Sequence, residues 1–114
     1  MRQMILMLAC LPTTALAQDW QPLGTASLKA ALAARTVAYD GGATQQFNAD
    51  GTTIYTTANP SFGKWRVEGA LYCSAWPPSD HWACYTVARS DDGLDLRFTA
   101  ADGSASVGRY VDLK

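Results

Sequence analysis

The chain has little of what most catalytic, metal-binding and nucleic-acid-binding sites are made from. Its 114 residues include one histidine, three cysteines and 17% charged residues, with ten acidic side chains against nine basic ones. Nucleic acids and anionic membrane surfaces are bound through clustered Lys and Arg, which this chain lacks, so both are poor candidates as partners. The apolar run at residues 4–11 is far shorter than the roughly 20 residues that a membrane-spanning helix needs.

The first residues contain the three parts of a secretory signal. Arg2 supplies a positive start, residues 4–11 the apolar stretch, and Ala15-Leu16-Ala17 a small-x-small cleavage site. We therefore expect a signal peptide over residues 1–17 and a periplasmic or secreted protein. A lipoprotein signal acylated at Cys10 is an alternative, although the apolar run before this cysteine is short.

Removing 17 residues from 114 leaves about 97, enough for a single domain over residues 18–114. Cys73 and Cys84 are then the only pair of cysteines, and an oxidising compartment favours a disulfide between them. A tetrahedral zinc site wants four ligands, whereas two thiols and His81 supply three. The cysteine spacing is also unlike a CxxC redox motif, so we expect neither a metal nor another cofactor.

The segment around these cysteines is symmetric. Pro78-Ser79 lies midway between Cys73 and Cys84, and the same midpoint pairs Tyr72 with Tyr85 and Trp76 with His81. Directly opposed residues of an antiparallel pair approach closely enough for a disulfide. This pattern predicts a hairpin whose strands are joined by a cross-strand cystine.

The rest of the chain reads as one helix followed by strands. Residues 25–35 predict a helix that Thr25 or Ser27 caps, with Arg35 in its last turn and its apolar residues on one face. Beyond it, four Asp-Gly pairs mark hairpin turns. Pro60 lies in a longer connection over residues 58–63, because proline is excluded from central strands. Besides the hairpin, the expected strands are residues 36–39, 44–47, 52–57, 64–68, 94–99 and 105–111.

These elements predict a mainly β fold. About eight short strands in an antiparallel up-and-down meander close most economically on themselves, because closure removes the sheet edges. We expect a small barrel with one short N-terminal helix. A flat two-sheet sandwich is the alternative.

Both faces of the predicted hairpin are apolar, although the wall of a barrel needs only one apolar face. The surplus aromatic side chains either pack against the helix and the N-terminal lead or form a binding surface. Packing is the commoner outcome. The candidate binding surface, for a small apolar ligand or a secreted protein, consists of Tyr72, Trp76, His81, Trp82 and Tyr85.

Signals of catalysis are weak. Ser79-Asp80-His81 has the residue types of a triad, but catalytic triads are assembled from separated segments, and adjacent residues of a tight turn point in different directions. Asp91, Asp92 and Asp95 lack the spacing of a calcium loop, and Asp-Asp-Gly is typical of a hairpin turn. We therefore expect no enzyme.

Two resemblances carry expectations of their own. Gly63-Lys64-Trp65 is similar to the Gly-x-Trp motif of lipocalins, small secreted barrels whose lumen carries apolar ligands, although the lipocalin motif opens the first strand. The order of this motif, Leu71-Tyr72-Cys73 and Cys84-Tyr85 resembles a set of small bacterial secreted β-proteins, which implies fold and compartment without an activity. The expected function is a non-enzymatic binding domain. The alternative is an inhibitor or accessory protein of a secreted cell-wall hydrolase that inserts the tip at residues 77–79.

Overall fold

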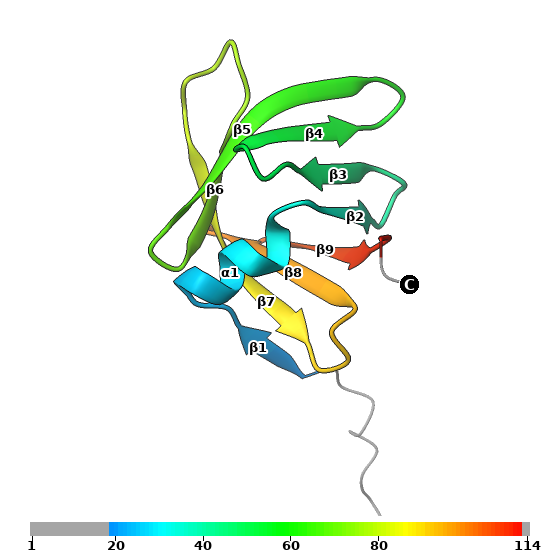
Figure 1. Ribbon diagram of the computed structural model, residues 1–114, viewed down its shortest axis with the longest axis vertical. Coiled ribbons are helices and arrows are strands. Elements are labelled where there is room, and N and C mark those ends of the chain that lie inside the picture. Colours follow the sequence, from blue (N-terminus) through cyan, green and yellow to red (C-terminus); the bar gives the residue numbers. More distant parts are fainter. Residues whose placement is uncertain (1–18, 113–114) are drawn as a thin grey trace, which may run out of the picture.

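The computed structural model describes residues 19–112, so the predicted signal peptide lies outside the described residues. It shows eight antiparallel strands closed into a barrel, one further strand and a short helix (Figure 1). The elements are β1 (Trp20–Pro22), α1 (Thr25–Leu32), β2 (Arg35–Tyr39), β3 (Thr44–Phe47), β4 (Thr52–Thr56), β5 (Pro60–Glu68), β6 (Leu71–Ala75), β7 (Ala83–Ser90), β8 (Asp95–Ala100) and β9 (Ala105–Tyr110).

The barrel is an up-and-down meander, as expected. Each strand from β2 to β8 pairs antiparallel with the next one in sequence, β8 pairs with β9, and β9 returns to β2. The sandwich alternative is therefore wrong. Because the strands alternate in direction, the turns after β2, β4, β6 and β8 all lie at one end of the barrel, which we call the mouth.

Strand β1 was not predicted. It pairs with the last residues of β7, from Pro22 opposite Ala88 to Trp20 opposite Ser90. β6 pairs only with the first part of β7, ending at Tyr72 opposite Tyr85. β1 therefore occupies the edge of β7 that β6 leaves free, beside which it lies in Figure 1.

The helix is shorter than predicted. It ends at Leu32 because Ala33 is extended and Ala34 has φ of 63°, so Arg35 is the first residue of β2 and not part of the last helical turn. The N-cap is Gly24, whose backbone N–H donates to Ser27 Oγ over 3.0 Å. Within residues 19–112, no helix combines the length and apolar character needed to cross a membrane.

The predicted turns are confirmed, and one prediction about a proline is wrong. The four Asp-Gly glycines, Gly41, Gly51, Gly93 and Gly103, have φ between 77° and 94°, a conformation that favours glycine. Pro60 is the first residue of β5 and not part of a connection. It is tolerated because residues 60–63 pair only with β4, and β6 joins β5 from Lys64 onward.

The helix closes the end of the barrel opposite the mouth. Leu28, Ala31 and Leu32 are at most 1% exposed, and they join a core centred on fully buried Phe47. Tyr110 fixes the helix to β9 by donating its hydroxyl to the carbonyl of Ala31 over 2.7 Å. This half of the barrel interior is filled by side chains.

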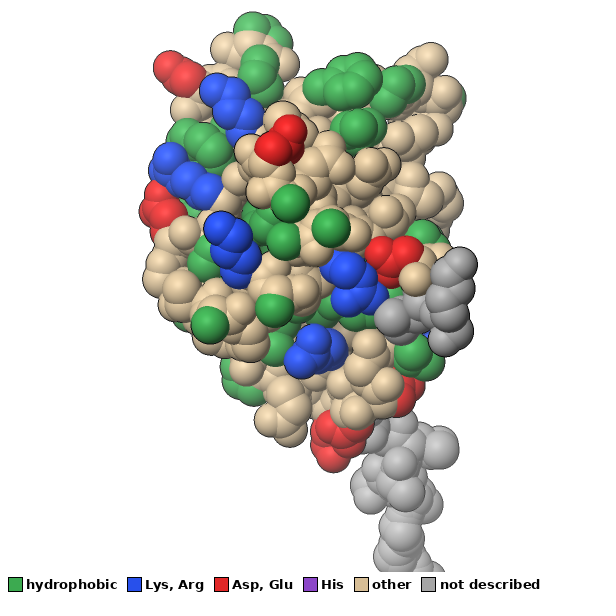
Figure 2. All heavy atoms as spheres, in the orientation of Figure 1, with side chains coloured by type: hydrophobic (Ala, Val, Ile, Leu, Met, Phe, Trp, Pro, Cys, Tyr) green, Lys and Arg blue, Asp and Glu red, His purple; other side chains and the backbone are tan. Residues whose placement is uncertain are grey.

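The outer surface of the barrel carries mixed charge. Figure 2 shows basic and acidic side chains interspersed on one face. It also shows a group of hydrophobic side chains over β4 and β5, where Phe62 is 66% exposed. The predicted disulfide is present, with the Cα atoms of Cys73 and Cys84 4.0 Å apart in directly opposed positions of β6 and β7.

Candidate functional site

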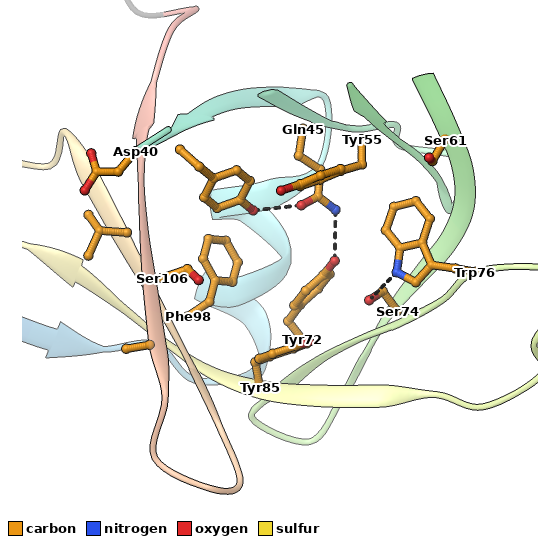
Figure 3. Close-up of a pocket in the computed structure, with 13 residues that line it drawn as sticks. Asp40, Gln45, Tyr55, Ser61, Tyr72, Ser74, Trp76, Tyr85, Phe98 and Ser106 are labelled. Carbon is orange, nitrogen blue, oxygen red and sulfur yellow. Dashed lines mark hydrogen bonds between the residues drawn. The ribbon is translucent and has the colours of Figure 1, made fainter. Parts of the chain in front are cut away.

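The mouth half of the barrel is hollow. A cavity of about 710 Å³ opens there, on the opposite side of the core from α1, which is visible behind the cavity in Figure 3. We call it the aromatic cup, and it is lined by Tyr39, Asp40, Gln45, Tyr55, Ser61, Tyr72, Ser74, Trp76, Tyr85, Phe98, Ala105, Ser106 and Val107.

Six aromatic rings form a continuous horseshoe around the cup. The chain of contacts runs from Trp76 to Tyr55 (centroids 6.2 Å apart), to Tyr39 (6.0 Å), to Phe98 (5.9 Å), to Tyr72 (5.6 Å) and to Tyr85 (5.8 Å). All of these separations lie in the range of favourable ring contacts. Because the rings come from five strands and the residue that follows β6, the wall exists only once the barrel is closed.

Two glycines make room for rings of this wall. A Cβ on Gly63 would lie 2.6 Å from Cε3 of Trp76 and 2.8 Å from the carbonyl oxygen of Ala75. A Cβ on Gly108 would lie 3.1 Å from the ring of Tyr39, the residue opposite it in β2. Neither glycine has positive φ, so the close approach of the rings, and not the backbone conformation, requires glycine here.

A buried amide joins three of the hydroxyl groups at the base of the cup. Gln45 is 5% exposed. Its Oε1 accepts a 2.7 Å hydrogen bond from the Tyr39 hydroxyl, and its Nε2 donates to Thr53 Oγ1 and to the Tyr72 hydroxyl, each over 3.0 Å. The two bonds to the tyrosines are drawn in Figure 3. This network satisfies polar groups that would otherwise be costly to bury.

The buried tyrosines stay neutral over the physiological range. Burial raises the pKa of Tyr39 far above its usual range, and the neighbouring Tyr72 adds to the effect. Burial also raises the pKa of Tyr72, although its hydrogen bonds to Ser74 and Gln45 oppose the rise. The cup therefore presents neutral phenols and aromatic faces.

Free polar groups and one charge complete the cup. Within residues 19–112, the hydroxyls of Tyr55 and Tyr85 make no hydrogen bond, and Asp40 is the one charged residue of the lining. Trp76 donates its indole N–H to Ser74 Oγ over 3.2 Å and so holds its ring at the mouth. This arrangement suits a ligand with an apolar body and a few polar groups.

The structure brings together three of the five residues predicted for the binding surface. Tyr72, Trp76 and Tyr85 line the cup, where the first two are buried and half-buried. His81 is exposed in the loop between β6 and β7. Trp82 lies outside the cup, with the guanidinium of Arg66 3.9 Å from its ring centroid.

Polar groups considered for catalysis take part in turns and in a cross-strand ion pair. Ser79 Oγ accepts the backbone N–H of His81 over 3.2 Å, and Asp92 accepts from Ser90 and Leu94 in the turn between β7 and β8. Asp95 pairs with Arg109, 2.8 Å away. In the described part of the chain, no group of three or more His, Cys, Asp or Glu is placed to hold a metal ion.

The residue-level prediction missed half of the horseshoe. Tyr39, Tyr55 and Phe98 stand on strands predicted correctly, but they were not assigned to the site. The signal available was the alternation along each strand, because all three share the inward face with core residues such as Val37 and Leu96.

Comparison of the chain with protein-family models, with curated proteins and with solved structures finds no match.

Proposed function

We propose that the protein is a non-enzymatic binding domain that holds a small ligand in the aromatic cup. The observation that carries the proposal is the contrast between the two halves of the barrel. The half under α1 is filled around Phe47, whereas the mouth half keeps a cavity of about 710 Å³ lined by six rings. Cavities of this size and apolar character are typical of small-molecule sites.

The chemistry of the lining supports binding more than catalysis. General acid–base catalysis works best with a group whose pKa lies near the working pH. The pKa values of Tyr39 and Tyr72 are raised by burial, which moves both away from neutral pH. Asp40 stands at the rim as a single carboxylate.

An exported location is part of the proposal. The disulfide between Cys73 and Cys84 is the kind of bond that persists in oxidising compartments. It agrees with the signal peptide expected from residues 1–17. A periplasmic or secreted carrier or sensor of a small molecule fits both features.

The proposal is tested by iodide quenching of tryptophan fluorescence, with and without a low-molecular-mass extract of the source cells. We expect the extract to protect the wild type from quenching, because Trp76 is half-buried at the mouth. Trp76→Phe should lose this protection, since it removes the reporter in the cup. Trp82→Phe, which removes a tryptophan outside the cup, should keep it. Equal quenching with and without extract in all three proteins would contradict ligand binding in the cup.

A second candidate is supported by the loop between β6 and β7. Residues 77–81 are exposed, and the disulfide joins the two strands at the base of the loop. A projecting, cross-linked loop suits insertion into the cleft of a secreted hydrolase. Replacing Pro77-Pro78 by Asn-Gly should then abolish inhibition of a cell-wall hydrolase while the melting temperature stays nearly unchanged. Inhibition that survives the replacement would rule this candidate out.

A further inference from the structure

We propose that the ligand of the aromatic cup is an organic cation, an alkylated ammonium group carried on an apolar body. This inference rests on the proposed function and names the ligand class of the same site. Its basis is the placement of six aromatic rings around one cavity whose lining has no Lys, Arg or His and whose one charged residue is Asp40, at the rim with its carboxylate directed away from the rings in Figure 3. Aromatic faces and a carboxylate attract positive charge, and ring cages are the common means of recognising alkylated ammonium groups.

Outside the cup, several aromatic rings are in contact with cationic side chains. Three rings outside the cup are each covered by a guanidinium group: Tyr110 by Arg35 at 3.9 Å, Trp82 by Arg66 at 3.9 Å and Trp20 by Arg97 at 4.7 Å. Among residues 19–112, no Lys or Arg side chain lies over any ring of the cup. The rings of the cup are therefore free to contact a cation supplied by a ligand.

The charges of the turns at the mouth also favour a cationic ligand. The four turns that surround the opening, residues 40–43, 57–59, 76–82 and 101–104, contain Asp40, Asp80 and Asp102 and no Lys or Arg. Within residues 19–112, every Lys and Arg lies in α1 or in a strand. A mouth with one sign of charge raises the local concentration of ligands of the opposite sign.

The size and polarity of the cup define the ligand further. A cavity of about 710 Å³ is much larger than a trimethylammonium group, so the ligand has an additional body that contacts the remaining rings. The free hydroxyls of Tyr55 and Tyr85 can bind polar groups on that body. Anionic ligands are disfavoured, because no cation in the lining would offset their desolvation.

The test compares choline with 3,3-dimethylbutan-1-ol, which has the same shape but a carbon atom in place of the charged nitrogen. Binding is followed by saturation-transfer NMR and by titration of tryptophan fluorescence in the full protein, with Trp76→Phe as the variant that removes the reporter in the cup. We expect choline to bind about 10-fold more tightly than the alcohol. Asp40→Asn should weaken choline binding about 2-fold, since Asp40 is exposed at the rim, and leave alcohol binding unchanged. Asp80→Asn, which removes the same charge from an exposed position outside the lining, is the matched control and should have a smaller effect.

The outcomes separate this inference from the proposed function. Tighter binding of choline that depends on Asp40 and weakens with added salt supports the inference. Equal or tighter binding of the alcohol overturns it and leaves a cup for neutral ligands. If neither probe binds while the cell extract still protects Trp76 from iodide, the inference is overturned and the binding function stands. If the extract also gives no protection, both are overturned.

Discussion

Replacing Gly63 by alanine tests how the wall of the cup is held. The new Cβ would lie 2.6 Å from Cε3 and 2.8 Å from Cδ2 of Trp76, and 2.8 Å from the carbonyl oxygen of Ala75. The ring can move, but the carbonyl belongs to the β5–β6 ladder. The substitution therefore has to displace the indole and distort the ladder locally.

The expected cost has three parts. Overpacking costs about 1–3 kcal/mol. Displacing Trp76 also loses its hydrogen bond to Ser74, about 1 kcal/mol, and its edge contact with Tyr55, about 1 kcal/mol. Since local relaxation lets these parts overlap, we expect Gly63→Ala to lower the free energy of unfolding by about 2–4 kcal/mol, measured by urea denaturation.

A double-mutant cycle identifies the cause. In a Trp76→Ala background two of the three close contacts are gone, so Gly63→Ala should cost about 1 kcal/mol less there than in the wild type. Gly24→Ala is the steric control, because its Cβ would meet no atom within 4 Å; its cost should be limited to the N-cap preference for glycine over alanine, about 1 kcal/mol or less. A Gly63→Ala protein with the wild-type denaturation midpoint, or one whose cost does not depend on Trp76, would refute the reasoning.

Three further predictions concern the base of the cup and the disulfide. Gln45→Leu should lower the free energy of unfolding by about 1–3 kcal/mol, because it leaves the half-buried Tyr39 hydroxyl and the buried Tyr72 hydroxyl without their partner; the exposed Gln46→Leu is the control, and equal urea midpoints for the two would contradict the network. The pKa of Tyr39 is raised in the folded state, so the unfolded state loses its proton first and stability falls by about 1.4 kcal/mol per pH unit above about pH 10; Tyr39→Phe should make this slope shallower in urea denaturation at several pH values. Cys73→Ala/Cys84→Ala should cost about 2–3 kcal/mol while the far-ultraviolet circular dichroism of the sheet persists, and loss of the sheet signal would show that the turns alone do not hold the barrel.

Local signals explain what the sequence predicted well. The register of β6 and β7 follows from the symmetry about Pro78-Ser79, and the structure pairs Tyr72 with Tyr85 and Cys73 with Cys84 as expected. The Asp-Gly turns were predictable because they depend on two adjacent residues. The closed barrel followed from the number and spacing of these signals.

Elements that depend on partners distant in the sequence could not be predicted from local patterns. Strand β1 exists because β7 extends beyond β6, and Trp20–Pro22 contains no strand pattern of its own. Pro60 begins β5 because one side of that segment has no neighbour, a fact of barrel geometry. In both cases the tertiary structure decides what a local rule could not.

The candidate site was predictable only in part for the same reason. The hairpin pattern places Tyr72, Trp76 and Tyr85 on one face, and these three do line the cup. Tyr39 meets Phe98 only after β9 closes onto β2. The alternation of apolar and polar residues along a strand predicts which side chains point inward. It does not predict whether those side chains fill the barrel or leave a cavity, because that depends on their total volume relative to the barrel interior.

The position of the cup along the barrel explains how a small domain can tolerate it. A cavity removes packing contacts and stability, but here the core around Phe47 and the helix supplies apolar burial at the other end. Gln45 stands at the boundary, where its amide satisfies hydroxyls that face both the core and the cup. The effect of a substitution should therefore depend on its position along the barrel. Substituting a ring at the mouth, such as Trp76, should affect ligand binding most, substituting Phe47 should affect stability most, and substituting Gln45 should affect both.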